Sequence, residues 1–160
     1  MSRKGQSKPR VVLPDTTYHS VTVSKIINYA MRGGKKAAST KEIYRALEIL
    51  QKETKSDDAV VTLEQALDNI KPKTEVRPRR IGGAVYQVPT LVRGNRQLSL
   101  AIRWLVASAR AMSNKQYHSF GEKLASELMA ALKNEGASVQ KRAEVERMAE
   151  ANKAFAHMRW

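Results

Sequence analysis

The feature that most constrains the fold is a short glycine-centred segment at residues 75–89. It reads Glu-Val-Arg-Pro-Arg-Arg-Ile-Gly-Gly-Ala-Val-Tyr-Gln-Val-Pro. Two runs that favour extended backbone flank a Gly-Gly pair, and this pattern predicts a tight β-hairpin. The rest of the sequence predicts helices and no second strand pair. A single basic hairpin must therefore belong to a mainly helical protein.

Apolar residues recurring at i, i+3, i+4 and i+7 predict about six helices. The expected ranges are 20–32, 39–50, 56–71, 95–110, 120–135 and 138–156. Ser39 with Glu42 predicts a capping box at the start of the second helix, and Asn95 is expected to cap the fourth.

The last of these helices has only a thin apolar stripe, formed by Val145, Met148 and Ala149. The expected fold is mainly α: a small bundle of about six helices with one protruding β-hairpin arm and an extended basic N-terminal tail. We expect a single domain over residues 1–160, with the extension at 1–14, the arm at 74–91 and the C-terminal helix and tail at 138–160.

The positive charge of the chain is concentrated in two segments. The formal net charge is +14, from 29 Lys and Arg against 15 Asp and Glu. Residues 1–14 hold four bases and no acid, and residues 71–103 hold eight bases and one acid, so the two segments carry eleven of the fourteen charges. Such clustering is typical of a protein that binds a polyanion.

The predicted hairpin is suited to gripping nucleic acid. With a turn at 82–83, Arg79 pairs with Tyr86 and Arg77 with Val88, and these four side chains share one face. We expect the guanidinium groups on that face to bind phosphates and the phenol ring to stack on a base or ribose. Because a two-stranded ribbon is marginal alone, a bound polyanion is expected to stabilise it. The alternative is a hairpin folded back on the body, with solvated arginines.

Several classes of function are not supported by the sequence. No cysteine is present, so disulfides and thiolate metal sites are excluded. His19, His118 and His157 are too scattered to predict a metal site, and the Gly-Lys at 34–35 lacks the rest of a phosphate-binding loop. We expect no catalytic residues, no cofactor, no metal and no enzyme activity. No run of residues is apolar enough for a signal peptide or a membrane span, so no membrane partner is expected.

The sequence resembles the bacterial family of ribosomal small-subunit protein seven over nearly its whole length. The resemblance is carried by Arg-Arg-Ile-Gly-Gly at 79–83, Tyr-Gln-Val-Pro at 86–89, Leu-Ala-Ile-Arg-Trp at 100–104, Arg-Met-Ala-Glu-Ala-Asn-Lys-Ala-Phe-Ala-His at 147–157 with Arg-Trp at 159–160, and Gly-Lys-Lys at 34–36.

This resemblance implies a helical body, a hairpin arm and a basic extension. It also implies a structural protein that binds the head (3′ major) domain of small-subunit ribosomal RNA, helps to nucleate head assembly and lies near the exit-site tRNA at the subunit interface. The implied partners are that RNA, neighbouring small-subunit proteins and exit-site tRNA, with messenger RNA as a further candidate. The implied location is the cytoplasmic ribosome, with an organellar ribosome left open.

The expected contacts fall into two sets. The residues expected to bind ribosomal RNA are Arg3, Lys4, Lys8, Arg10, Lys35, Lys36, Lys71, Lys73, Arg77, Arg79, Arg80, Gly82, Gly83, Tyr86, Arg93 and Arg96. The residues expected to contact tRNA or a neighbouring protein are Arg79, Gly82, Gly83, Arg142, Arg147, Asn152, Lys153, His157, Arg159 and Trp160.

Three alternatives are open at this level. Lys35 and Lys36 could be solvated turn lysines, and the chain end could be a frayed terminus. An architectural DNA-binding protein whose arm enters a groove would share the charge pattern.

Overall fold

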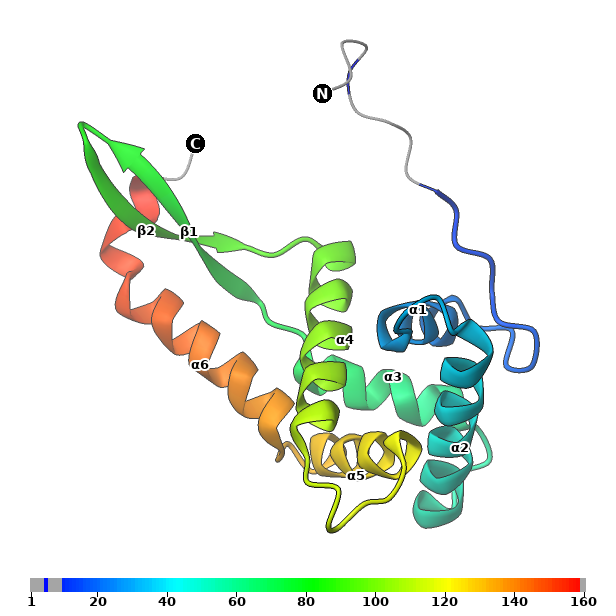
Figure 1. Ribbon diagram of the computed structural model, residues 1–160. Helices are drawn as coiled ribbons and strands as arrows, with labels where there is room; N and C mark the ends of the chain where they lie inside the picture. The colour runs from blue at the N-terminus through cyan, green and yellow to red at the C-terminus, as the bar shows by residue number, and fades with distance from the viewer. Residues whose placement is uncertain (1–4, 6–9, 159–160) are drawn as a thin grey trace.

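Six α-helices, one 3₁₀ helix and one two-stranded antiparallel sheet make up the part of the chain that the structure describes (Figure 1). The structure is a computed structural model that describes residue 5 and residues 10–158. In chain order the elements are α1 Val21–Ala30, α2 Lys36–Thr54, α3 Ala59–Ile70, β1 Thr74–Ile81, β2 Ala84–Leu91, α4 Gly94–Ala111, α5 Phe120–Leu132, α6 Ala137–Ala151 and the 3₁₀ helix η1 Lys153–Met158. The predicted fold class, mainly α with a hairpin arm, is confirmed.

Helices α1 to α5 form a body around one aliphatic core. Each of the five helices contributes large side chains that are fully buried, and these follow the predicted stripes. They are Ile26, Ile27, Ile43, Leu47, Leu50, Leu63, Leu67, Ile70, Ile102, Leu105, Leu124 and Leu128. The apolar periodicity of the sequence therefore accounts for the body.

The capping box predicted at Ser39 is wrong. Helix α2 begins three residues earlier, at Lys36, and the Ser39 hydroxyl donates instead to the carbonyl oxygen of Ile27, 2.9 Å away. This bond joins α2 to α1 and uses the hydroxyl that a cap would need. A complete capping box is found instead at Ser119 and Glu122, where α5 begins.

Other predicted helix limits also differ from the structure, and those of α4 and α6 bear on the site. The residue before α4 is Arg93 rather than Asn95, and it makes no side-chain cap bond. Helix α6 ends at Ala151, and the chain continues as η1 where one helix was predicted to residue 156. Helix ends depend on contacts beyond the local sequence, so they are predicted less well than the stripes.

Helices α2 and α5 approach each other closely at Gly121. A Cβ atom built at this glycine would lie 2.8 Å from the backbone oxygen of Glu42, so no larger residue fits without moving a helix. The Gly121 amide donates to Oε2 of Glu42 at 2.7 Å. The missing side chain and this bond together hold the start of α5 against α2.

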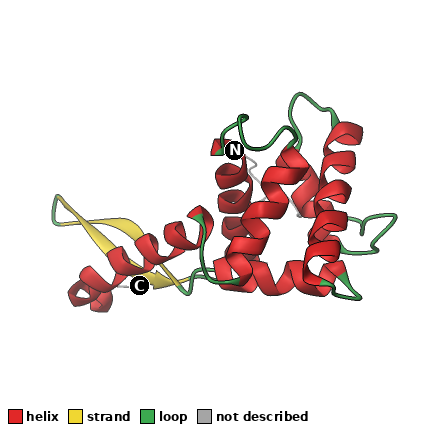
Figure 2. Ribbon diagram, turned by 90° about the horizontal axis from the view of Figure 1, so that it is seen from below, coloured by secondary structure: helices red, strands yellow, loops and turns green. Residues whose placement is uncertain are grey.

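The hairpin extends away from the body together with α6 and η1, and we call these three elements the arm (Figure 2). Helix α6 packs along β1, and η1 packs along β2. Val88 is 0% exposed, and the rings of Tyr86 and Phe155 lie 5.3 Å apart. The hairpin is therefore not an isolated ribbon, because the C-terminal elements of the same chain cover it. Its stabilisation by a bound polyanion stays a prediction.

Helix α6 joins the arm to the body at its first turn. The buried carboxylate of Glu127 in α5 accepts hydrogen bonds from the Ser138 amide at 2.8 Å and from the Ser138 hydroxyl at 2.6 Å. Farther along α6, Ala149 is buried as predicted, but Met148 is 47% exposed. The predicted burial of Met148 is therefore wrong, because the packing of α6 against the strands covers Ala149 and leaves Met148 on the open side of the helix.

Candidate nucleic-acid interface

The start of β1 lies against the first turn of α4, and we call this junction the neck of the arm. The Glu75 carboxylate is buried there between two arginines. Arg77 Nε donates to Oε1 at 2.7 Å, and Arg96 Nε donates to Oε1 and Oε2 at 2.9 and 2.8 Å. The one acid of the predicted basic segment thus brings together two of its arginines, one from each element.

Two opposed effects act on the pKa of Glu75. Burial raises it, but hydrogen bonds from Arg96 and Arg77 and the charges of both guanidinium groups lower it. The balance leaves the pKa below its ordinary value of 4.5, so the carboxylate is charged at neutral pH.

The predicted register of the hairpin is confirmed. Arg79 pairs with Tyr86 and Arg77 with Val88 across a turn at Gly82 and Gly83. Both glycines have positive φ, +57° and +93°, which explains why glycine occupies both positions. Both are exposed at the tip.

The two faces of the hairpin differ from the expected arrangement. On the predicted binding face, Val88 is buried and the Tyr86 ring lies against Phe155, so stacking on a base would require that ring to leave its contact. The opposite face carries Arg80, Val85 and Gln87, all of which are exposed. Arg79 is half-buried, and Arg77 is exposed at the neck.

A second basic surface, formed by α1 and α4, was missed by the sequence analysis. The Tyr29 hydroxyl lies 2.7 Å from Ser99 Oγ and bridges the two helices. The bond with Ser99 is the main cause of the lowered pKa of Tyr29, and Arg103 and Lys25 lower it further against partial burial. The exposed Tyr29 ring therefore lies within the positive electrostatic field of this surface. The spacing of Arg96, Ser99 and Arg103 on one helix was the signal available in the sequence.

The turn between α1 and α2 adds further cations. Lys35 and Lys36 are exposed there, as expected for either phosphate contacts or solvated lysines. Arg110 of α4 donates through Nη2 to the Ala30 carbonyl oxygen at 2.9 Å. Burial lowers the pKa of Arg110, and the charge of Arg32 lowers it further. Arg32 and Arg110 thus lie close enough to repel each other, which favours an anion beside them.

The described part of the basic tail leaves the body beside these surfaces. Tyr44 of α2 donates to both carboxylate oxygens of Asp15, at 2.9 and 2.8 Å, which holds the point where the tail meets the body. Arg10 is exposed, and in Figure 1 the described part of the tail lies on the α1 and α2 side of the body, opposite the side from which the arm extends. Arg3, Lys4 and Lys8 lie outside the described residues.

Comparison with known proteins agrees with this geometry. A family profile described as ribosomal protein S7p/S5e matches residues 2–153. The small ribosomal subunit protein uS7 of Thermoanaerobacter pseudethanolicus is 53% identical over 160 residues, which is all of both chains. The proteins of the same name from Sulfurihydrogenibium sp. and Stenotrophomonas maltophilia are 49% and 46% identical, again over the full length of both chains.

The chain belongs to the ribosomal protein S7p/S5e family. The resemblance seen in the sequence is confirmed by these matches. A member of this family is a structural protein of the ribosome and not an enzyme. Among the described residues, no helix is long and apolar enough to cross a membrane. No cluster of three or more His, Asp or Glu side chains suited to a metal ion is found in the same part of the chain.

Some residues predicted to bind RNA in this family member are engaged within the protein. Lys71 is half-buried and pairs with Asp68 at 2.5 Å. Lys73 and Arg93 are exposed at the neck, and the Lys73 backbone amide cannot donate to an RNA phosphate because it already donates to Glu146 Oε1 at 2.9 Å. At the neck, the Lys73 side chain is therefore available for a contact with RNA, but its backbone amide is not.

Of the residues predicted to contact tRNA or a neighbouring protein, some are bonded within the protein and others are exposed. Arg142 points inward, where it donates to the carbonyl oxygen of Asn69, whereas Arg147 is exposed. Asn152 Nδ2 donates to the Met148 carbonyl oxygen at 2.8 Å. Two more, Lys153 and His157, are exposed on η1. Arg159 and Trp160 lie outside the described residues.

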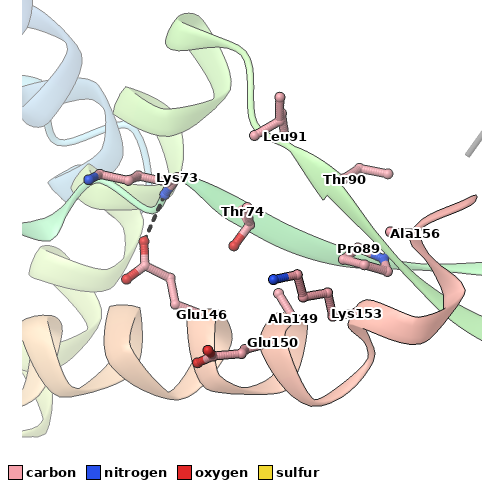
Figure 3. Close-up of a pocket in the computed structure, with 10 residues that line it drawn as sticks. All are labelled: Lys73, Thr74, Pro89, Thr90, Leu91, Glu146, Ala149, Glu150, Lys153 and Ala156. Atoms are coloured by element: carbon pink, nitrogen blue, oxygen red, sulfur yellow. Dashed lines mark hydrogen bonds between the residues drawn. The ribbon is translucent and has the colours of Figure 1, made fainter.

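A groove of about 450 Å³ separates the base of the hairpin from α6 (Figure 3). Thr74 and Pro89 line it from the strands, and Ala149 lines it from α6. Its charged residues are mixed in sign, with Lys73 and Lys153 opposed by Glu146 and Glu150. The two carboxylates make this groove unsuited to phosphate, so it does not extend the cationic surface.

Proposed function

We propose that the chain is an RNA-binding structural constituent of the small ribosomal subunit, acting in the cytoplasm. It binds the head (3′ major) domain of small-subunit ribosomal RNA, helps to nucleate head assembly, and lies near exit-site tRNA at the subunit interface. Family membership supports the coarse assignment. The observation that carries the RNA contact is the series of exposed cations running from the hairpin through the neck and α1–α4 to the tail.

This arrangement suits RNA because the cations belong to several elements and surround no enclosed pocket. Side chains spread over a broad surface contact the backbones of neighbouring RNA segments, and such contacts recognise the shape of the RNA rather than a short sequence. An interface with about six to ten phosphate contacts would lose roughly three to five decades of affinity between about 50 and 200 mM salt, by the rule established for DNA.

The chain end is proposed as the contact with tRNA or a neighbouring protein. The tip glycines are exposed at the hairpin turn, Arg147 is exposed on α6, and Lys153 and His157 are exposed on η1. Messenger RNA is a further candidate partner at this end. The architectural DNA-binding alternative is not supported by any specific observation, since the full-length relatives carry the name of a ribosomal protein.

Filter binding to an RNA fragment that spans the head domain tests the proposal. The variant Arg79→Ala with Arg80→Ala should bind less tightly and with a salt slope smaller by about one or two. The control is Lys52→Ala, at an exposed lysine in the last turn of α2, which should leave the slope unchanged. Equal affinity for unrelated RNA or for duplex DNA would contradict the proposal.

A further inference from the structure

Arg77 and Arg96 are held differently from the other arginines whose bonds are described. Their hydrogen bonds to Glu75 use Nε alone, at 2.7 to 2.9 Å. Arg45 and Arg110 are instead bonded through Nη2, to Glu122 and to a backbone carbonyl. Because the Nε contact lies on one edge of the guanidinium, it leaves the Nη groups of Arg77 and Arg96 available.

Burial decides which way the two guanidinium groups present those Nη atoms. The Glu75 side chain is 8% exposed, whereas the side chains of Arg77 and Arg96 are 49% and 50% exposed. The carboxylate therefore lies inside the neck, and the arginines cover it from the solvent side. A second ligand must approach from the solvent, where an Arg fork can bind two oxygen atoms at once.

The carboxylate itself is placed by rigid surroundings. Glu75 pairs with Thr90 in the hairpin register, and Thr90 Oγ1 donates to the Glu75 carbonyl oxygen at 3.4 Å. Two residues before it, the Lys73 carbonyl oxygen accepts a bond from the Val92 amide at 3.1 Å. The position of Glu75 is thus defined by the base of the sheet.

We propose that Arg77 and Arg96 together bind one phosphate group of the RNA through their Nη groups, with Glu75 as the residue that positions both. The proposal deepens the proposed function and rests on it. The ligand class is a phosphodiester, whose two non-bridging oxygens match two guanidinium forks brought together from β1 and α4. Glu75 lowers the net charge of the site by one and in return sets the orientation of two donors.

Charge and orientation predict opposite effects of removing the Glu75 carboxylate. A negative group beside a phosphate repels it, so charge alone predicts that Glu75→Gln tightens RNA binding. If Glu75 positions the arginines, the same substitution weakens binding even though the protein becomes more positive. The sign of the change therefore separates the two roles.

The test is filter binding of the full chain to the head-domain RNA fragment at several salt concentrations. We expect Glu75→Gln to bind about tenfold more weakly, since charge-assisted bonds to phosphate lose their geometry. Arg96→Lys keeps the charge but loses the fork, and we expect a loss of about the same size. Arg45→Lys, at a half-exposed arginine of α2 that pairs with Glu122 and lies outside the proposed interface, is the matched control and should change affinity by no more than about twofold.

Urea unfolding of each variant identifies loss of affinity that is due to loss of structure. If Glu75→Gln unfolds, Arg96→Lys decides, because it retains the carboxylate and its bond to Arg77. Unchanged or tighter binding by folded Glu75→Gln, or unchanged binding by Arg96→Lys, would overturn the phosphate site and leave the proposed function intact. Failure of the unsubstituted protein to bind the fragment would instead overturn the proposed function.

Discussion

The body and the arm of this protein are stabilised in different ways. Five helices of the body bury large aliphatic side chains against one another, whereas the burial of the arm centres on Val88, Thr90 and Ala149. The arm buries less apolar surface, and hydrogen bonds at the neck and at the start of α6 help to hold it in place. Much of the exposed basic charge lies on the arm, which buries less apolar surface than the body. The residues expected to bind RNA are therefore largely different from those that stabilise the fold.

The largest expected effect comes from a cavity in the body. Leu128→Ala removes a side chain that is fully buried among the helices, and we expect it to cost about 2–5 kcal/mol in the free energy of unfolding. Urea denaturation followed by circular dichroism measures the loss. Under conditions where the variant is folded, its RNA affinity should match that of the unsubstituted protein. A specific loss of affinity would show that body and arm are coupled more tightly than their contacts indicate.

A smaller loss is expected where the arm joins the body. Glu127→Ala leaves the buried amide and hydroxyl of Ser138 without their acceptor, which costs about 1–3 kcal/mol. Glu127→Gln keeps an acceptor oxygen of the same reach and is the matched control. Hydrogen exchange should speed up first in α6 and the hairpin. Uniform acceleration over the body helices would contradict a local role for this carboxylate.

Mild acid should loosen the neck before it affects the body. The pKa of Glu75 is lower in the folded protein than its ordinary value of 4.5, so the carboxylate contributes stability above that value. This contribution is lost as the pH falls below about 4.5 and through the lower folded pKa. Glu75→Gln should have a flatter stability profile in this range. Parallel profiles of the two proteins would exclude Glu75 as a source of acid sensitivity.

The ring contact at the far end of the arm should matter less. Phe155→Ala removes the partner of Tyr86, and aromatic pairs of this kind are worth about 0.5–1.5 kcal/mol. We expect faster hydrogen exchange in β2 with little change in the melting of the body. Phe155→Leu keeps much of the apolar area and serves as the control. An effect as large as that of Leu128→Ala would mean that the arm and body unfold as one unit.

The smallest effect is expected at a solvent-accessible ion pair. Lys71→Ala removes the 2.5 Å contact with Asp68, and pairs of this kind contribute about 0–1 kcal/mol. High salt should abolish the difference in the free energy of unfolding. A larger, salt-insensitive loss would assign Lys71 a packing role through its half-buried stem.

The body and the arm also differ in how much of their structure could be predicted from the sequence. The body followed from apolar periodicity, and the hairpin register followed from a two-residue glycine turn, because both signals are local. The packing of α6 and η1 against the hairpin could not be predicted from the sequence. Helix α6 has a thin stripe, and its packing partner is a strand pair about sixty residues earlier in the chain.

Polar side chains were the least predictable, since their partners were distant. Ser39 matched a capping pattern locally, but its hydroxyl bonds to Ile27 in the preceding helix. Tyr29 meets Ser99 seventy residues later, and no local pattern links the two.

The sequence alone determined the helical body, the hairpin and the concentration of charge in two segments, because turn chemistry, periodicity and composition need no knowledge of distant contacts. Tertiary structure decided which hairpin face is open and which arginines meet. Glu75 illustrates the division: in the sequence it is one acid among eight bases, and in the fold it binds Arg77 and Arg96 from two elements. The physical reason is that a buried carboxylate must find its cations wherever the packing of β1 against α4 brings them.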